Sequence, residues 1–360
     1  MKPSRALLAA GLIIASCLAA PPVIPWLRGA ESLPESIPDS EFWKMTADLS
    51  EPAGWFRSDN LLSNEIGFPF IVSDLAKAAS PAHVYMGVGP EQNFNYIAVL
   101  KPKMAFIVDI RRGNLDLQLM YKALFDLSLD RADFVSRLFS VRRPASVNGS
   151  STPEQIFAAV SSAQKSDELY GENLKAIQAD LVEKHHFALL PDDLDGIAGV
   201  YVAFYTYGPG IRYSSSQGGG FGGFNQPSYA ELMAAADGDG TFRSYLASEQ
   251  TFQVLKELES KNLLVPVVGN FGGKKAIRAV GQYVKDHGAV VSTFYLSNVE
   301  MYLYQQDLWN TFCRNVASLP LDDTSVFIRS SRGGASYSYG RGFGLNLSLV
   351  PMAAEVKDCR

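Results

Sequence analysis

The sequence has few of the residues that most often mark a catalytic or metal-binding site. It contains 3 cysteines and 4 histidines in 360 residues, with no CxxC pair and no HExxH pattern. It also lacks the GxSxG turn of α/β-hydrolases and the Walker loop of P-loop nucleotide hydrolases. The adjacent His185 and His186 would face different sides of a helix, and the paired Asp192 and Asp193 are expected to end a helical region. We therefore expect no metal site, and no motif names a catalytic residue.

Charge and hydropathy exclude two further classes of protein. The net charge is −5 and the isoelectric point is about 5.5, without long blocks of like charge, so a general nucleic-acid binder is excluded. Beyond the N-terminal segment, no apolar run is long enough to span a bilayer. A composition of 47% hydrophobic and 19% charged residues instead suits a globular protein of one large domain or two small ones.

The N-terminus has the features of an export signal. Lys2 and Arg5 precede the apolar run ALLAAGLIIASCLAA, which matches the charged and hydrophobic regions of a signal peptide. We expect residues 1–20 to be a signal, residues 21–40 to be a tether, and the protein to be exported to the cell envelope. The stretch IASC resembles a lipobox, so Cys17 is the candidate for lipid attachment. An ordinary cleaved signal and an uncleaved anchor are the alternatives.

Two cysteines remain after Cys17. Cys313 lies in a helical pattern, and Cys359 is the penultimate residue of the chain. In an exported protein they could form a disulfide, or Cys313 could be buried while Cys359 stays free in the tail. The sequence leaves both alternatives open.

Short apolar runs alternate with amphipathic helices through most of the chain. Such runs suit parallel strands that are covered on both faces, so the alternation predicts an α/β, Rossmann-like, mostly parallel sheet over residues 41–360. We expect an N-terminal helical lead-in over 41–80 and a helical insertion over about 114–187, followed by a strand at GIAGVYVAFYTYG. The other predicted strands are 83–89, 104–110, 263–269, 289–296 and 324–330, and the tail GLNLSLVPM could add an edge strand.

The first predicted strand ends in a glycine turn. Gly87 and Gly89 bracket a valine in HVYMGVG, and glycine there lets the backbone turn sharply and lets a ligand approach a helix N-terminus. Asp109 lies about twenty residues further on, at the end of the next strand, where an acidic side chain binds a ribose hydroxyl. An NAD fingerprint would need glycine at position 92, where Gln92 stands. The alternative is a tight turn with a capping or salt-bridged aspartate.

Two further polar stretches follow predicted strands at the same edge of the sheet. Asn270 lies in VVGNFGGKKA, where Lys274 and Lys275 open a helix against its dipole, so they serve either an anion or only the solvent. Ser297 and Asn298 follow a later strand, and they either face a ligand or cap the next helix.

These stretches together resemble the class I S-adenosylmethionine-dependent methyltransferases. That family has a looser glycine turn, the same acidic residue and a polar motif at the fourth strand, and VYMGVGPEQNF, MAFIVDI and FYLSNVEMYL are similar to these parts. The stretch VPVVGNFGGKKAIRAVGQYV also looks like a family of bacterial exported proteins without an established activity. The resemblance to methyltransferases implies a nucleoside-type ligand and S-adenosylmethionine as the candidate cofactor. The resemblance implies Gly87, Gly89, Asp109 and Asn298 as binding residues, and Asn270 joins them as a candidate because it follows a predicted strand.

Export and methyl transfer conflict, because S-adenosylmethionine is made in the cytosol and the basic N-terminus puts the large domain outside. The sequence therefore supports two functions. One is a methyltransferase-like cell-envelope protein that binds a nucleoside-type ligand, with catalysis unproven; the other is a non-catalytic binding protein on a degenerate Rossmann scaffold. The first needs an open pocket between Gly89, Asp109 and Asn298, and the second expects side chains to fill it. The expected partners are a small molecule and, through the signal or a lipid on Cys17, the membrane.

Overall fold

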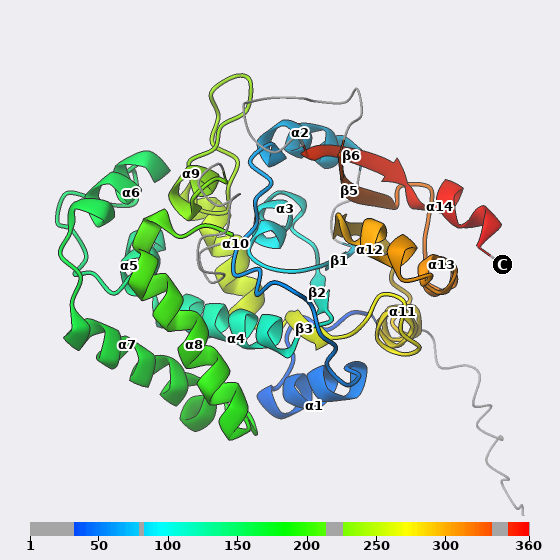
Figure 1. Ribbon diagram of the computed structural model, residues 1–360, viewed down its shortest axis with the longest axis horizontal. Helices are drawn as coiled ribbons and strands as arrows, with labels where there is room; N and C mark the ends of the chain where they lie inside the picture. The colour runs from blue at the N-terminus through cyan, green and yellow to red at the C-terminus, as the bar shows by residue number, and fades with distance from the viewer. Residues whose placement is uncertain (1–31, 79–82, 214–225, 333–344, 360) are drawn as a thin grey trace, which may run out of the picture.

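A six-stranded sheet organises the residues that the computed structural model describes, which are 32–78, 83–213, 226–332 and 345–359 (Figure 1). The strands are β1 (Val84–Gly87), β2 (Met104–Asp109), β3 (Leu264–Val268), β4 (Val291–Ser297), β5 (Val326–Arg332) and β6 (Leu345–Pro351). Strands β1 to β5 are parallel, and β6 pairs antiparallel with β5. The five predicted parallel strands and the predicted edge strand are therefore confirmed, as is the α/β fold class.

The strand order β3-β2-β1-β4-β5-β6 creates a switch point between β1 and β4. From β1 the chain adds β2 and β3 on one side, and it then returns to add β4 and β5 on the other. Strands β1, β2 and β3 are buried throughout, as expected of parallel strands that are covered on both faces. Ligands of open α/β sheets bind at the carboxyl ends of the strands beside such a switch point.

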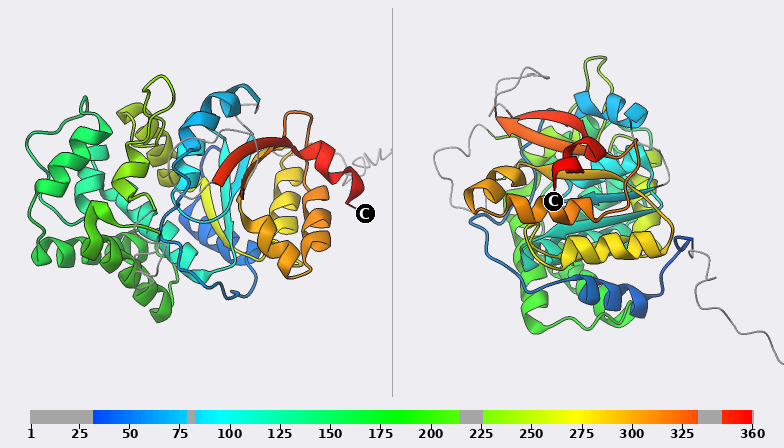
Figure 2. Two further views of the ribbon diagram at one scale, coloured as in Figure 1. Left: turned by 45° about the horizontal axis from the view of Figure 1, so that its top comes forward. Right: turned by 90° about the vertical axis from the view of Figure 1, so that its right-hand side faces the viewer.

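Helices cover both faces of the sheet (Figure 2). On one side lie α11 (Ala276–Asp286), α12 (Val299–Gln305) and α13 (Trp309–Ala317), and the helical insertion between β2 and β3 extends from the other side. The insertion consists of α4 (Arg112–Leu127), α5 (Arg131–Leu138), α6 (Pro153–Ser162), α7 (Asp167–Ala179), the π-helical turn η2 (Asp180–Lys184), α8 (Pro191–Tyr207), the short turn η3 (Gly208–Gly210), α9 (Tyr229–Met233) and α10 (Glu249–Ser260). The remaining helices are α1 (Asp39–Leu49) and α2 (Phe68–Ala78) of the predicted lead-in, α3 (Gln92–Leu100) between β1 and β2, and α14 (Met352–Glu355) with η6 (Val356–Asp358) at the end.

The helical insertion is longer than the sequence predicts. It reaches α10, and GIAGVYVAFYTYG forms part of α8, so the predicted strand there is wrong. The β-branched and aromatic residues favour a strand locally, but the buried positions recur at helical spacing. These positions are Ile197, Val200, Tyr201 and Phe204. Gly196 also lets α8 approach α4, because a Cβ at this position would lie 2.2 Å from Asp116 Oδ2.

Two local expectations about helix ends are also wrong. Asp192 and Asp193 lie in the first turn of α8 instead of ending a helical region, and Asp193 forms a bidentate ion pair with Arg112 at 2.8 and 2.9 Å. The apolar spacing of NVEMYLYQQDLWNTFCRNVA predicts a single helix after β4. The stretch forms two, α12 and α13, because the chain turns at Asp307, whose φ is 57°.

Cys313 and Cys359 form a disulfide, which decides between the two alternatives that the sequence left open. The bridge links α13 to the end of the chain across 46 residues. Within the described ranges, no helix has both the length and the apolar character needed to cross a bilayer. The predicted signal, Cys17 and the first part of the tether lie outside the described residues.

Candidate ligand-binding site

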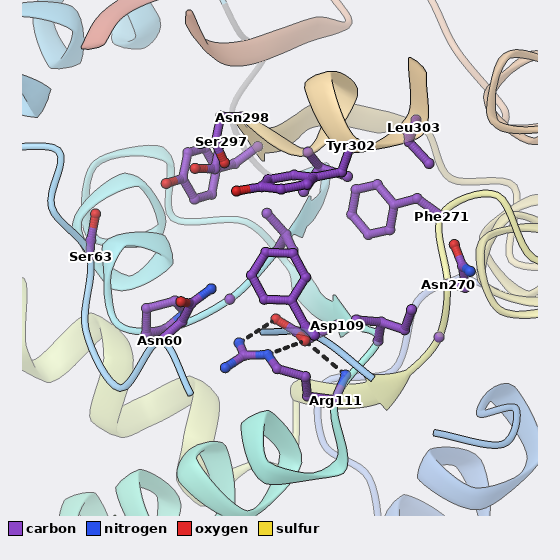
Figure 3. Close-up of a pocket in the computed structure, with 18 of the residues that line it drawn as sticks. Asn60, Ser63, Asp109, Arg111, Asn270, Phe271, Ser297, Asn298, Tyr302 and Leu303 are labelled. Atoms are coloured by element: carbon purple, nitrogen blue, oxygen red, sulfur yellow. Dashed lines mark hydrogen bonds and ion pairs between the residues drawn. The ribbon is translucent and has the colours of Figure 1, made fainter. Parts of the chain in front are cut away.

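An open pocket lies at the carboxyl edge of the sheet, beside the switch point (Figure 3). Gly89 follows β1, Asp109 ends β2, Asn270 follows β3 and Asn298 follows β4, and all four residues line the pocket. The pocket contains about 1010 Å³ of empty space, its open mouth included. Four of the five predicted binding residues therefore meet in one pocket that side chains do not fill. The fifth, Gly87, is not among the described lining residues.

The glycine turn after β1 is held by Asn93, a residue that the sequence did not point to. Its Nδ2 donates to the backbone oxygens of Val88, Gly89 and Pro90 at 2.9, 3.3 and 2.7 Å. Gly89 has a φ of +78°, a conformation that favours glycine. A Cβ on Gly87 would lie 1.9 Å from Asn93 Oδ1. Gly87 thus makes room for Asn93, which shapes the turn, and has no direct contact with the pocket.

Asp109 is buried and paired with Arg111, two residues further along the chain. Its Oδ1 accepts from the backbone N and the Nε of Arg111, both at 2.9 Å, and its Oδ2 accepts from Nη2 at 2.8 Å. A carboxylate offers about four acceptor positions, so roughly one stays open, on Oδ2. That oxygen lies beside the glycine turn, because a Cβ on Gly89 would be 3.9 Å from it. The salt-bridged aspartate that the sequence allowed is therefore present, and it keeps one acceptor.

A segment between α1 and α2 forms a wall of the pocket that the sequence did not predict. Its lining residues are Trp55, Phe56, Asn60, Leu62, Ser63 and Asn64. Arg111 Nη1 donates to the backbone oxygens of Ser58 and Asp59, which ties this segment to the end of β2. Figure 3 shows Asn60 and Ser63 across the pocket from Asn270. No motif marks the segment, since it precedes the sheet in sequence and reaches the pocket only through folding.

Aromatic side chains form much of the pocket surface. The rings of Phe56 and Tyr302 meet edge to face with their centroids 5.0 Å apart. The guanidinium of Arg57 lies 5.6 Å from the Tyr302 ring centroid and donates to its hydroxyl at 3.0 Å. Phe271 lines the pocket beside Asn270 (Figure 3). Flat aromatic faces of this kind suit a planar base or a bound cation.

At the end of β4, two pocket residues contact a buried carboxyl group. Tyr295 donates from its hydroxyl to Glu65 Oε2 at 2.9 Å, and Ser297 Oγ donates to Oε1 at 2.7 Å. Burial raises the pKa of Glu65, and the hydroxyls of Ser297, Tyr295 and Ser330 oppose that rise. Asn298 precedes α12, but its side chain makes no capping hydrogen bond. The capping alternative for Asn298 is therefore not observed, and its side chain borders the pocket (Figure 3).

A second buried carboxyl group, Glu91, lies next to the pocket residue Pro90. Its Oε1 accepts from the backbone N of Ser63 at 3.0 Å, and its Oε2 has no hydrogen-bond partner within the described residues. Burial is the main cause that raises the pKa of Glu91 to about 8, and the charge of Glu65 adds to the rise. Glu91 is therefore mostly protonated at neutral pH.

The loop between β3 and α11 already holds a carboxylate of the same chain. Glu51 accepts from the backbone N of Asn270 at 2.7 Å and from that of Lys275 at 3.2 Å. Lys275 also donates from Nζ to the backbone oxygen of Ser50 at 2.6 Å. A Cβ on Gly273 would lie 2.1 Å from Glu51 Oε1. These loop groups therefore anchor the chain after α1, and they are not available to an external anion.

A separate cluster of ionisable groups joins the insertion to α1. Asp126, Asp180 and His185 bring potential ligand atoms within 4.8 Å of one another. His185 Nε2 lies 2.7 Å from Asp126 Oδ2, and its Nδ1 lies 2.8 Å from Asp39 Oδ1. Burial opposes protonation, but these carboxylates raise the pKa of His185. The ammonium of Lys184 contacts Asp126 and Asp180 at 3.1 and 2.8 Å, and thus supplies the cation of the cluster.

The described lining residues of the pocket offer hydrogen bonds and aromatic surface. Asp109 is the one carboxylate among them, and Arg111 cancels its charge. Histidine, cysteine and lysine do not occur in that described lining set. The arrangement has room for a planar ring and for hydroxyl groups that donate to Asp109.

The sheet order, the switch point and the pocket define a Rossmann-like α/β protein with a large helical insertion. The chain belongs to the family described as Domain of unknown function (DUF7790), whose model matches residues 62–186 and 156–354. The matched residues contain the ends of β1, β2, β3 and β4, and with them the predicted binding residues. A search of curated proteins finds no match to the chain.

Proposed function

We propose that the protein binds a nucleoside-type ligand at the carboxyl edge of the sheet, with S-adenosylmethionine as the candidate cofactor. The observation that carries the proposal is the open pocket bordered by Gly89, Asp109 and Asn298 at the switch point of a parallel sheet. Ligands of doubly wound sheets occupy this position. The resemblance of the strand-end residues to class I methyltransferases supports the nucleoside part of the proposal.

Two features of the pocket suit two parts of such a ligand. Asp109 Oδ2 keeps one acceptor position for a ribose hydroxyl, beside the glycine turn. The rings of Phe56, Phe271 and Tyr302 offer apolar faces for a base or for the sulfonium cation of S-adenosylmethionine. The ligand would thus lie across the ends of several strands.

We propose ligand binding as the function of this pocket, with catalysis unproven. Asp109, the carboxylate among the described lining residues, is paired with Arg111, which makes it a weak general base for a methyl acceptor. Export would also separate the protein from cytosolic S-adenosylmethionine. Incubation of the protein with this cofactor and envelope extracts tests the point, because sustained formation of S-adenosylhomocysteine that is lost in Asn298→Ala would demonstrate methyl transfer.

The binding proposal is tested by titration calorimetry with adenosine and 2′,3′-dideoxyadenosine. We expect adenosine to bind more tightly by about 1–3 kcal/mol, because the dideoxy compound leaves the acceptor on Asp109 unpaired. The wild-type protein serves for both ligands, so the result does not depend on whether a variant folds. Equal affinities would remove Asp109 from the site, and the absence of any nucleoside binding would contradict the proposal itself.

The alternative is a non-catalytic binding or interaction protein of the cell envelope on a degenerate Rossmann scaffold. The pairing of Asp109 with Arg111 favours it, because three of about four acceptor positions are already occupied. Thermal unfolding distinguishes the two, since a ligand that binds only the folded state raises the melting temperature. If no nucleoside-type compound raises it, the alternative is the better account.

We also propose that the protein is exported to the cell envelope, with Cys17 as the candidate for lipid attachment. The disulfide between Cys313 and Cys359 supports export, because disulfides form and persist mainly in oxidising compartments. Mass spectrometry of the mature N-terminus tests this proposal. An intact, unmodified Met1 on a cytosolic protein would contradict it.

A further inference from the structure

Two hydroxyl groups of the pocket wall share one buried carboxyl group. Tyr295 and Ser297 line the pocket, and both donate hydrogen bonds to Glu65, which lies 230 and 232 residues earlier in the chain. Glu65 is 3% exposed. Burial raises the pKa of Glu65, and the hydroxyls of Ser297, Tyr295 and Ser330 oppose that rise.

The backbone at the end of β4 is bent at Ser297. Its φ is 49°, in the left-handed region that residues other than glycine rarely adopt. The pairing of β4 with β5 also changes register between Tyr295 and Ser297, and such irregularities re-aim side chains near binding sites. A sparsely populated backbone conformation beside a pocket is the kind of feature that motivates a functional role.

The hydrogen bonds to Glu65 decide what these hydroxyls can offer a ligand. In the structure both carboxyl oxygens of Glu65 accept, so each hydroxyl uses its single proton toward Glu65. The remaining lone pairs of both oxygens can then only accept a hydrogen bond. A ligand that contacts this wall must therefore present an N–H or O–H donor.

We propose that Tyr295 and Ser297 form a subsite that accepts hydrogen bonds from an amino group of the ligand, with Glu65 as the positioning residue that orients both hydroxyls. The inference rests on the proposed binding of a nucleoside-type ligand in the same pocket. The amine is either the exocyclic amine of the base or the amine of an amino-acid tail. A carbonyl or carboxylate at this position would face lone pairs and be rejected.

The first experiment deletes the amine from the ligand and uses the wild-type protein. Adenosine is compared with purine riboside, which lacks the exocyclic amine, and S-adenosylhomocysteine is compared with 5′-S-(3-carboxypropyl)-5′-thioadenosine, which lacks the α-amine. We expect about a tenfold or greater loss of affinity in one of the two pairs, which also identifies the source of the amine. If both pairs bind equally well, the subsite is refuted while nucleoside binding stands. If none of the four compounds binds, both proposals fail.

The second experiment changes the positioning residue. In Glu65→Gln the amide nitrogen donates to one of the two hydroxyl oxygens, and the proton of that hydroxyl then points into the pocket. We therefore expect most of the difference in affinity between the ligands with and without the amine to be lost. Ser297→Ala removes one acceptor and should reduce the preference even if Glu65→Gln does not fold. Ser162→Ala, at the exposed end of α6 and not among the described lining residues, is the control, and it should leave the affinity ratio of each pair unchanged. A folded Glu65→Gln protein with the full wild-type preference would overturn the role of Glu65.

Discussion

The pocket wall at the end of β2 (the β2 wall) and the pocket wall at the end of β4 (the β4 wall) each contact a buried carboxyl group. The surroundings of these two carboxyl groups are opposite in character. On the β2 wall, Asp109 meets the guanidinium of Arg111 at 2.8 Å, so its charge is cancelled within the protein. On the β4 wall, Glu65 meets two uncharged hydroxyl groups. An ion pair fixes the chain around it, whereas a carboxyl group without a cation orients the neighbouring dipoles that a ligand meets. We therefore assign the Asp109–Arg111 pair mainly to stability and the hydroxyls beside Glu65 mainly to recognition.

The largest expected effect comes from removing the cation of the β2 wall. Arg111→Ala leaves Asp109 as an unpaired buried charge and also removes the bonds to the backbone of Ser58 and Asp59. We expect a loss of about 3–5 kcal/mol in the free energy of unfolding. Urea unfolding followed by circular dichroism measures it.

A double variant sharpens this first prediction. Asp109→Ala combined with Arg111→Ala removes both charges, so its loss should be smaller than the sum of the two single losses. Additive losses would show that the two side chains act independently, and would contradict the assignment of the β2 wall to a buried ion pair.

The disulfide is expected to stabilise the side of the sheet on which the β4 wall of the pocket lies. Cys313 lies in α13, which follows α12 and its pocket residue Tyr302, and the bridge to Cys359 closes a loop of 46 residues. In Cys313→Ser we expect a loss of about 2–4 kcal/mol, because the unfolded chain gains freedom. Guanidinium unfolding without reductant measures it, and reduced wild-type protein is the control. Equal stability of the variant and the oxidised wild type would contradict the prediction.

Over any single pH unit, the smallest expected effect is a pH dependence from Glu91, which lies behind the turn between the two walls. Its pKa is raised from 4.5 to about 8 mainly by burial, so the folded protein binds more protons than the unfolded chain between these values. Stability is therefore expected to be full below about pH 4.5 and to fall as the pH rises toward 8, by at most about 1.4 kcal/mol per pH unit.

Glu91→Gln should flatten this slope because it removes the titrating group. Burial also raises the pKa of Glu259 to about 8, so this residue offers a matched control. Glu259→Gln should remove the contribution of Glu259 to the pH dependence of stability and leave the contribution of Glu91 unchanged. Unfolding curves from pH 5 to 8 measure both, and an unchanged slope in Glu91→Gln would show that Glu91 does not govern it.

The sheet and four residues of the site could be predicted because they depend on local patterns. The runs that form β1 to β5 are apolar and short, and residues at their carboxyl ends must share one edge once the strands are parallel. This reasoning brings Gly89, Asp109, Asn270 and Asn298 together. The prediction of a strand within α8 was wrong because its apolar residues fit both the two-residue period of a strand and the 3.6-residue period of a helix. Packing against α4 selects the helix.

Spacing along the chain encodes the alternation of strands and helices, the glycine turn and the polar residues at the strand ends. The groups that neutralise or hydrogen-bond those polar residues come together only when the chain folds. Arg111 takes most of the acceptors of Asp109, Glu51 occupies the loop after β3, and Glu65 orients Tyr295 and Ser297. Glu51 and Glu65 lie more than 200 residues from their partners, as their hydrogen bonds record. Folding alone creates such pairs, since burial removes the water that would otherwise serve each carboxylate.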